Sequence, residues 1–273
     1  MSHDLNPSSP GGFYLPDKRH LVITISGANK DIGKSSLAAY LTAHCRNCAG
    51  MKISMHEEPP TGEAIISESE SSSDVDTDTA RIYRAGARPV LWLRTIRESL
   101  FRDFMEALSG IEAPVLIVEG NSLLEHLDPD YAVFIMGPNF EDFKPSAHTA
   151  IRKADTIVIN GDSEISGAKL LELEKEIKRL NPKAKMVVVS ELGKERAWEI
   201  VLSRVAGRVG GEYMSGEVNE KVLEAVKAGA KEGRINCAAA LELARELGVP
   251  PQEVGKAANT LNIKIANCSL GCF

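Results

Sequence analysis

A glycine-containing segment near the start of the chain carries the residue types that bind phosphate. It reads LVITISGANKDIGKSS from position 21, so that an apolar run enters a loop bounded by Gly27 and Gly33. Lys34 and Ser35 then open a helical pattern. A strand, a glycine loop and a helix in this order are the context of a phosphate-binding loop. Five residues separate the two glycines where the strict pattern has four, so Ala28 stands at the first glycine position.

The residues of this loop supply different parts of a nucleotide site. Main-chain N–H groups at a helix N-terminus attract an anion, because they lack partners and because the helix dipole favours negative charge there. We expect Lys34 to contact the β- and γ-phosphates as the catalytic residue, and Ser35 to give its hydroxyl to Mg²⁺. The predicted nucleotide-binding residues are Gly27, Ala28, Asn29, Lys30, Asp31, Ile32, Gly33, Lys34, Ser35, Ser36 and Asn160.

A carboxylate for the metal is expected at the end of a neighbouring strand. The run PVLIVEG places apolar residues directly before Glu119, and open α/β sheets bind their ligands at the carboxyl ends of strands. We therefore predict that Ser35 and Glu119 hold Mg²⁺. The alternative is that Glu119 caps a helix or faces solvent after a core strand.

Two other pairs of polar residues each have two interpretations. Asn160 and Asp162 follow an apolar run on the ligand side, where they either read a base edge or form an Asn-Gly-Asp turn. Arg81 and Arg84 either face phosphates or a partner's nucleotide, or are solvated and paired with nearby carboxylates. The second interpretation is favoured for the arginines, because such pairs are common on protein surfaces.

Apolar runs and helical patterns alternate along most of the chain. Runs rich in Val, Ile and Leu are typical of parallel strands buried on both faces. They cover residues 21–26, 51–56, 89–94, 114–119, 131–136, 156–160 and 185–190, and helical patterns cover 35–48, 96–108, 147–153, 165–180 and 195–205. The sequence therefore predicts an α/β fold with a doubly wound, mostly parallel sheet of the P-loop NTPase type, followed by a small all-helical C-terminal domain.

Composition limits the class of protein and the domain plan. The 273 residues are 43% hydrophobic and carry a net charge of -6, which excludes a wholly disordered chain and argues against a general nucleic-acid coat protein. No secretory signal and no apolar stretch of the ~18–20 residues that a membrane span needs is found, so we expect a cytoplasmic protein. The predicted parts are a disordered leader (1–12), a P-loop nucleotide-binding domain (13–211) with an acidic mobile loop (57–78), and the helical domain (217–273).

The C-terminal segment has helix-turn-helix spacing and three of the five cysteines. Its helical pair could bind DNA, but the second helix carries little positive charge, so packing or protein docking is preferred. Cys237, Cys268 and Cys272 could bind zinc or an iron–sulfur cluster with a fourth ligand from elsewhere. Cys45 and Cys48 form a C-x-x-C pair, for which reduced thiols are favoured over metal binding.

Three motifs together resemble the molybdopterin-guanine dinucleotide biosynthesis protein B family. They are the GANKDIGKSS loop, the segment from Asp76 to Leu93, and LIVEG at 116–120. The resemblance covers roughly residues 20 to 165. The loop and the VEG end are also similar to dethiobiotin synthetase and the cobyrinic acid amidating enzymes. The matching positions outside the loop are Asp78, Thr79, Ala85, Gly86, Ala87, Val118, Glu119 and Gly120.

The resemblance implies a GTP-binding protein, often dimeric, with weak hydrolysis, that assists the attachment of a nucleotide to molybdopterin. A homodimer, Mg²⁺, GTP ahead of ATP, and a molybdopterin-processing enzyme as partner follow as expectations, with no role for a membrane. Two other hypotheses are retained. One is an ATP-dependent ligase or kinase that activates a carboxylate, like dethiobiotin synthetase, and the other is a regulator whose nucleotide state controls the helical tail's grip on DNA or protein.

Overall fold

The computed structural model describes residues 20–266, except residues 63, 69–75, 140–142, 144, 162–164, 212, 215–219, 232, 248 and 250. The predicted leader and the cysteines at 268 and 272 lie outside these residues. None of the helices in the described part is both long enough and apolar enough to span a lipid bilayer.

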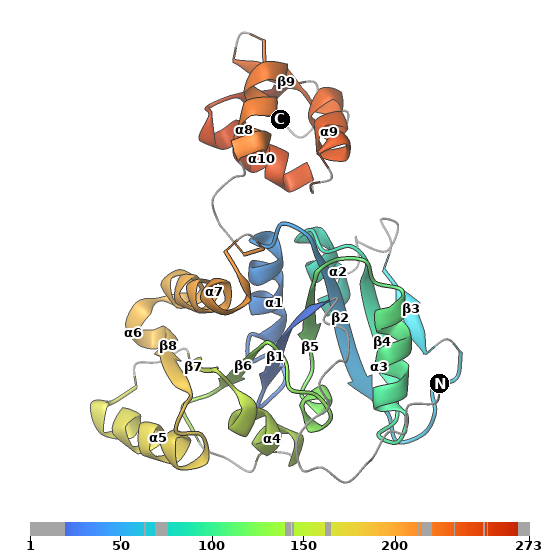
Figure 1. The fold of residues 1–273 in the computed structure, drawn as a ribbon. Coiled ribbons are helices and arrows are strands. Elements are labelled where there is room, and N and C mark those ends of the chain that lie inside the picture. Colours follow the sequence, from blue (N-terminus) through green and yellow to red (C-terminus); the bar gives the residue numbers. More distant parts are fainter. Residues whose placement is uncertain are drawn as a thin grey trace.

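An eight-stranded sheet forms the centre of the molecule (Figure 1). Its order is β3-β4-β2-β5-β1-β6-β7-β8, and all neighbours are parallel except β3 and β4. The apolar runs of the sequence form seven of these strands, which confirms the predicted fold class. The strands are β1 (Leu21–Gly27), β2 (Cys48–Met55), β3 (Ile65–Ser67), β4 (Val90–Thr95), β5 (Val115–Glu119), β6 (Tyr131–Met136), β7 (Thr156–Ile159) and β8 (Lys185–Val188).

Helices cover both faces of the sheet, so the core has three layers. One face packs against α1 (Lys34–Ala43), α2 (Asp78–Arg84) and α7 (Lys194–Val209). The other packs against α3 (Leu100–Ser109), α4 (Pro145–Lys153) and α5 (Gly167–Leu180). The short η2 (Ser122–Glu125) and α6 (Val189–Leu192) complete the core. Alternate residues of each central strand face the two layers, which is why whole strands are apolar.

Several predicted boundaries differ from the structure. The first helix ends at Ala43 rather than at residue 48, because Cys48 already pairs with Val115 and begins β2. Cys45 and Cys48 are reduced thiols in the core, each 4% exposed. The segment predicted as a loop over 57–78 contains β3, and the strand predicted to reach residue 190 gives way to α6 at Val189.

The C-terminal segment forms a second cluster with its own apolar centre. It contains α8 (Glu220–Gly229), α9 (Cys237–Glu246) and α10 (Pro251–Thr260), which enclose Val226, Ile235 and Val254. The all-helical prediction is wrong, because β9 (Arg234–Asn236) and β10 (Lys264–Ala266) pair in parallel. The cluster lies beyond the end of the core at which α1 ends (Figure 1).

Candidate functional site: a phosphate pocket

The predicted phosphate loop lies at the centre of the sheet. It joins β1 to α1, and β1 stands between β5 on one side and β6 on the other. After β5 the chain crosses β1 and forms β6 on its other side. The loop therefore lies where the winding of the sheet reverses. Ligand sites of open α/β sheets occur at such switch points, outside the carboxyl ends of the strands.

Two asparagine side chains, just after the ends of β5 and β7, hold the loop in place. The N–H of Gly27 donates to Asn121 Oδ1 at 2.9 Å, and Asn121 Nδ2 donates back to the Gly27 carbonyl at 2.9 Å. Asn160 Nδ2 donates to the Ile32 carbonyl at 2.8 Å. The amide nitrogen predicted to read a base edge thus anchors the loop, and Asp162, weighed with it, lies outside the described residues.

The front of the loop presents main-chain donors. Within the described part of the chain, the N–H groups of residues 29–33 make no main-chain hydrogen bond. The backbone turns through left-handed conformations at Asp31 (φ 57°) and Gly33 (φ 106°). A Cβ on Gly33 would lie 3.1 Å from Asn160 Nδ2 and 3.9 Å from the Trp198 ring, so glycine meets both the backbone and the space requirement there. These N–H groups can receive an anion.

A pocket of about 420 Å³ opens in front of the loop. Its walls combine positive and negative side chains from β2, α2 and the end of β5 with the loop itself. Five predicted nucleotide-binding residues, Gly27, Ala28, Asn29, Ile32 and Asn160, are not among those that line it. The lining residues are Lys30, Asp31, Gly33, Lys34, Ser35, Ser36, Lys52, Asp78, Arg81 and Glu119.

Lys34 spans the loop from the first turn of α1. Its Nζ donates to the Asn29 carbonyl at 2.7 Å, which bends the side chain back along the loop. Burial lowers the pKa of the Lys34 ammonium from its ordinary value of 10.5, although Glu119 partly opposes the shift. An ammonium held this way in a partly desolvated site interacts more strongly with a phosphate than it would in water.

A cluster of two carboxylates, one ammonium and one hydroxyl lies beside Lys34. Ser35 Oγ donates to Asp78 Oδ1 at 2.6 Å. Lys52 Nζ donates to Glu119 Oε1 at 3.1 Å and forms an ion pair with Asp78. The strand register explains the first contact, because Lys52 of β2 is paired with Glu119 of β5. Asp78 is the first residue of α2, which Thr77 caps by accepting a hydrogen bond from the Ala80 N–H.

The pKa values of the cluster reflect mutual neutralisation. Burial alone would lower the pKa of the Lys52 ammonium, but the charges and hydrogen bonds of Glu119 and Asp78 outweigh it and raise the value above 10.5. Burial likewise opposes ionisation of Asp78, yet hydrogen bonds from Lys52 and Ser35 hold its pKa below 3.8. Both groups are therefore charged at neutral pH, and Lys52 stands between two carboxylates as a cation.

The oxygen atoms of this cluster fit a magnesium ion. Glu119 is 2% exposed, and its Oε2 has no hydrogen-bond partner within the described residues. Ser35 Oγ and the Asp78 carboxylate lie on the same side of the pocket. Hydroxyl and carboxylate oxygens are the ligands that Mg²⁺ prefers. The buried oxygen of Glu119 argues against the interpretation in which this side chain merely faces solvent.

The remaining sequence predictions concern arginines and cysteines. Arg81 donates to both carboxylate oxygens of Asp76, at 2.9 and 3.0 Å, and Arg84 lies 3.7 Å from the same carboxylate, as the favoured interpretation expects. Cys237 is partly exposed at the start of α9. No group of three or more His, Cys, Asp or Glu side chains suited to a metal occurs among the residues described, and the two tail cysteines lie outside them.

Lys52, Asp78 and Asn121 were not predicted as site residues. A signal for Lys52 exists in the sequence, because it is the single charged residue within the apolar strand CAGMKISM. Asn121 follows directly after the VEG strand end, and Asp78 belongs to the segment that carries the family resemblance. Each contacts the loop or the carboxylates only through tertiary packing, which a local motif does not reveal.

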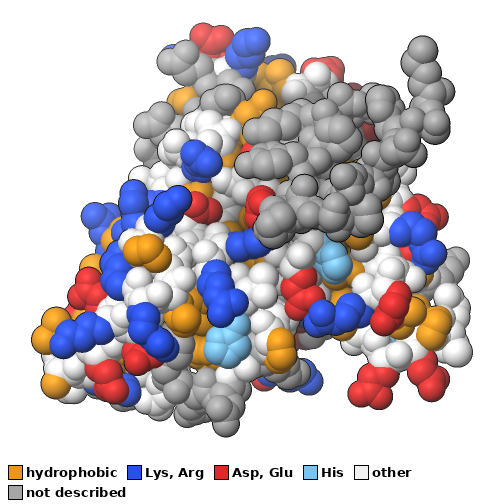
Figure 2. All heavy atoms as spheres, turned by 60° about the horizontal axis from the view of Figure 1, so that its bottom comes forward, with side chains coloured by type: hydrophobic (Ala, Val, Ile, Leu, Met, Phe, Trp, Pro, Cys, Tyr) orange, Lys and Arg blue, Asp and Glu red, His pale blue; other side chains and the backbone are white. Residues whose placement is uncertain are grey.

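One face of the molecule carries charges of both signs. On the face drawn in Figure 2, Lys and Arg side chains are interspersed with Asp and Glu side chains, and neither sign gathers into a broad field. Capture of a small anion by a few placed groups suits such a surface better than binding of a long polyanion, which needs an extended basic stripe.

The strand, loop and helix around Lys34, at the switch point of a mostly parallel sheet, give an α/β fold of the P-loop NTPase type. No protein-family model matches the sequence, and no curated protein matches it. Among solved structures, hydrogenase maturation factor HypB from Archaeoglobus fulgidus is 17% identical with a TM-score of 0.45, covering 70% of this chain and 90% of that one.

Two further solved structures are more remote. HypB from Helicobacter pylori, in complex with nickel, is 14% identical with a TM-score of 0.41, over 73% of this chain and 92% of that one. The MinC:MinD cell division protein complex of Aquifex aeolicus is 14% identical with a TM-score of 0.32, over 67% and 89%. Structural similarity at this level does not indicate a function. The function is inferred from the residues of the pocket.

Proposed function

We propose that the chain binds a nucleoside triphosphate together with Mg²⁺ in the phosphate pocket. The observation that carries the proposal is the convergence of Lys34, Ser35, Asp78 and Glu119 in one pocket in front of main-chain N–H groups. The pocket supplies donors for phosphate oxygens on one side and acceptors for a hard cation on the other. Few other ligands need both sets at once.

Each residue then has a defined task. The N–H groups of residues 29–33 and the Lys34 ammonium hold phosphate oxygens. Ser35, Asp78 and Glu119 hold the metal, which when bound neutralises phosphate charge. Lys52 bridges the two carboxylates and offsets the repulsion between them. The mechanism is mainly positional, since the protein fixes the phosphates and their counter-charges.

We propose further that the protein acts in molybdenum-cofactor maturation, as an adaptor or a slow NTPase that prefers GTP to ATP. The support is the set of motif residues shared with the molybdopterin-guanine dinucleotide family, of which Asp78 and Glu119 lie in the pocket. A molybdopterin-processing enzyme would be the partner, and the working form a homodimer. Tail cysteines that bind zinc or an iron–sulfur cluster remain part of the same proposal.

A second candidate is an ATP-dependent ligase or kinase that activates a carboxylate. The five-residue spacing between Gly27 and Gly33 favours it, since the loop is similar to that of dethiobiotin synthetase. The two candidates predict different behaviour. An adaptor binds GTP tightly with negligible turnover, whereas the ligase hydrolyses ATP rapidly only when its carboxylic acid is present.

The test is a titration of the purified protein with GTP and ATP, each with and without Mg²⁺, by calorimetry. Trp198, which lies beside Gly33, gives an independent fluorescence signal from the loop. We expect saturable binding that requires Mg²⁺ for full affinity. A folded protein that binds neither nucleotide would overturn the proposal, and elemental analysis for Zn, Fe and Mo tests the metal part.

A further inference from the structure

Next to the phosphate pocket, four side chains share one face of two adjacent strands. The register of β2 and β4 pairs Lys52 with Trp92 and Ser54 with Arg94. Residues paired across parallel strands point to the same side of the sheet, and residues two apart on one strand do so as well. Lys52, Ser54, Trp92 and Arg94 therefore form a compact patch, called here the β2–β4 strip. Lys52 is common to the strip and the phosphate pocket.

Helix α2 covers the neighbouring part of this face. A Cβ added to Gly50 would overlap the Ile82 side chain of α2 and would lie 3.4 Å from Val90. The helix begins at Asp78, beside Lys52, so the strip continues the face beyond that helix end. Trp92 keeps 37% of its surface exposed there, although it is one of the largest apolar side chains of the protein.

The polar groups of the strip orient the Trp92 ring. Its Nε1–H donates to Ser54 Oγ at 2.9 Å, which ties the ring edge to the adjacent strand. The Arg94 guanidinium carbon lies 5.6 Å from the ring centroid, within the range of a cation–π contact. The indole is thus fixed in orientation while part of it still faces outward. A fixed aromatic plane is a suitable surface for stacking a flat ring.

Arg94 differs from the arginines around it. Arg88 donates to two main-chain carbonyls, and Arg97 forms a 2.7 Å ion pair with Glu125. For the Arg94 guanidinium, the described part of the chain provides no carboxylate or carbonyl partner, only the contact with Trp92. A guanidinium beside an exposed aromatic ring, without a bound acceptor, is available for a carboxylate or phosphate.

We propose that the β2–β4 strip binds a second ligand beside the nucleotide: a flat aromatic or heteroaromatic ring that carries a negatively charged substituent. The ring stacks on Trp92, and the charged group contacts Arg94. The other end of the ring then faces Lys52, one strand away from Trp92, at a spacing of about 4.8 Å between strands. The role of this ligand as a second substrate rests on the proposed nucleotide function, whereas its binding to the strip does not.

The two tryptophans of the chain allow the sites to be followed separately. Trp198→Phe leaves Trp92 as the reporter of the strip, and Trp92→Phe leaves Trp198 as the reporter of the phosphate loop. The probe is quinoline-2-carboxylate, with quinoline-2-carboxamide as the uncharged control and cyclohexanecarboxylate as the non-planar control. We expect saturable quenching of Trp92 by the carboxylate, and calorimetric affinities roughly tenfold weaker for each control, the size expected for loss of one stacking or charge contact.

Substitutions assign the contacts. Arg94→Gln should remove the preference for the carboxylate over the carboxamide, and Arg94→Lys should restore part of it. Arg179→Gln, which removes an exposed charge on α5, should leave both affinities unchanged. Trp92→Leu should weaken the planar probes roughly tenfold. Thermal melts establish that each variant is folded. If Trp92→Leu does not fold, the Arg94 variants alone test the proposal.

The proposal is overturned if quinoline-2-carboxylate does not bind, or if it binds with an affinity that neither Arg94→Gln nor Trp92→Leu alters. Failure of the nucleotide function gives a different result. In that case the Trp92→Phe protein shows no Trp198 response and no heat with GTP or ATP, while the probe still quenches Trp92 in the Trp198→Phe protein.

Discussion

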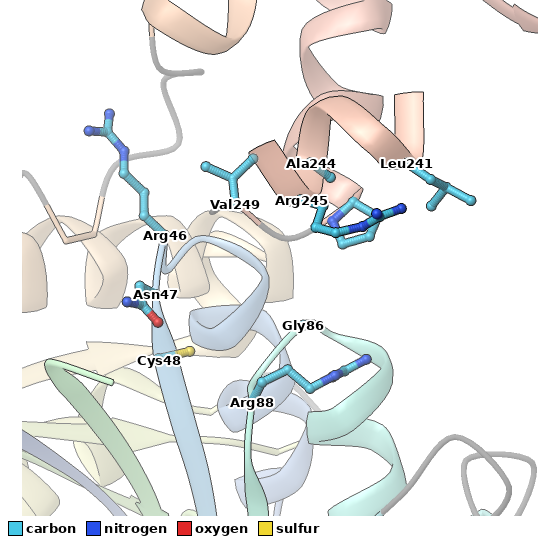
Figure 3. Close-up of a pocket in the computed structure, with 10 residues that line it drawn as sticks. Arg46, Asn47, Cys48, Gly86, Arg88, Leu241, Ala244, Arg245 and Val249 are labelled. Carbon is cyan, nitrogen blue, oxygen red and sulfur yellow. The ribbon is translucent and has the colours of Figure 1, made fainter. Parts of the chain in front are cut away.

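Two cavities of similar size lie at opposite ends of the sheet. The phosphate pocket, about 420 Å³, lies at the carboxyl ends of the strands. A second cavity of about 470 Å³ lies at the opposite end of β2, between the core and the C-terminal helices (Figure 3). Its walls are Arg46, Asn47, Cys48, Gly86 and Arg88 from the core, and Leu241, Ala244, Arg245, Val249 and Pro251 from the helical cluster.

The two cavities offer different polar groups to a ligand. In the second cavity, Arg88 bonds the Tyr83 and Ala87 carbonyls at 2.7 and 2.6 Å and stacks on the Tyr83 ring, while Arg245 bonds Glu242 at 2.6 Å. In the phosphate pocket, a buried Glu119 oxygen and several N–H groups have no partner among the described residues. What marks the phosphate pocket is the combination of a buried acceptor and main-chain donors that have no partner among the described residues, beside Lys34 and Ser35.

The largest expected difference is between two variants that each remove one cation, one at each cavity. Lys34→Ala should weaken nucleotide binding roughly 100-fold or more, because it leaves phosphate charge unpaired in a partly buried site. Arg245→Ala, at the second cavity, should leave the affinity unchanged. Calorimetry with Mg²⁺-GTP and Mg²⁺-ATP measures both. Equal nucleotide affinities of the two variants would contradict the assignment of the nucleotide site.

Glu119→Gln is expected to separate metal from phosphate binding. The amide keeps the size of the side chain but loses the charge that a cation needs, so the Mg²⁺ concentration for half-maximal nucleotide binding should rise roughly 10- to 100-fold. Nucleotide affinity measured without Mg²⁺ should change little. An unaltered Mg²⁺ requirement would show that the buried oxygen of Glu119 serves the fold instead.

A substitution at Gly50 tests whether helix α2 connects the two cavities. Helix α2 starts at Asp78 in the phosphate pocket, and Gly86, just after it, lines the second cavity. Gly50→Ala would drive a Cβ into Ile82 on this helix, so it should destabilise the protein by about 1–3 kcal/mol and weaken nucleotide binding through Asp78.

Gly207→Ala is the matched control. It adds the same methyl group within α7, where nothing lies within 4 Å, and should stabilise by up to about 1 kcal/mol. Urea denaturation measures both changes. Equal stability of the two variants would show that the contact between Gly50 and Ile82 relaxes without cost.

The smallest effect concerns pH. The pKa of Asp78 is held below 3.8 in the folded protein, so its ion pair contributes stability above that pH and loses it as the pH falls through the folded value. The difference in melting temperature between wild type and Asp78→Asn should be constant at neutral pH and shrink between about pH 5 and pH 3. A difference independent of pH over this range would contradict the ion pair with Lys52.

The sequence was sufficient for those parts of the site that are local. Glu119 is the last residue of β5, and Lys34 and Ser35 open α1 after the short loop that follows β1, so their positions depend on strand ends that an apolar run reveals. Lys52 and Asp78 meet because β2 is in register with β5 and because α2 packs beside it. Such pairing depends on strand order and register, which the pattern of one strand does not contain.

The strands that the sequence pattern does not predict are short. β3, β9 and β10 have three residues each, too few for a period of two to stand out. Asn160 illustrates a different limit. The sequence predicts it on the ligand side of the sheet, but its amide donates to the Ile32 carbonyl, a contact between residues 128 positions apart. Hydrogen bonds between residues so far apart in the sequence can be identified only in the structure.

The outer strands of the large sheet bear on how copies of this chain can associate. β3 and β8, at its two margins, are three and four residues long. A neighbouring molecule that extended the sheet would gain main-chain hydrogen bonds over only that length. Short margins of this kind resist the open-ended strand addition that leads to aggregates. We therefore expect any assembly of this protein to be closed and finite, formed through its helices and loops.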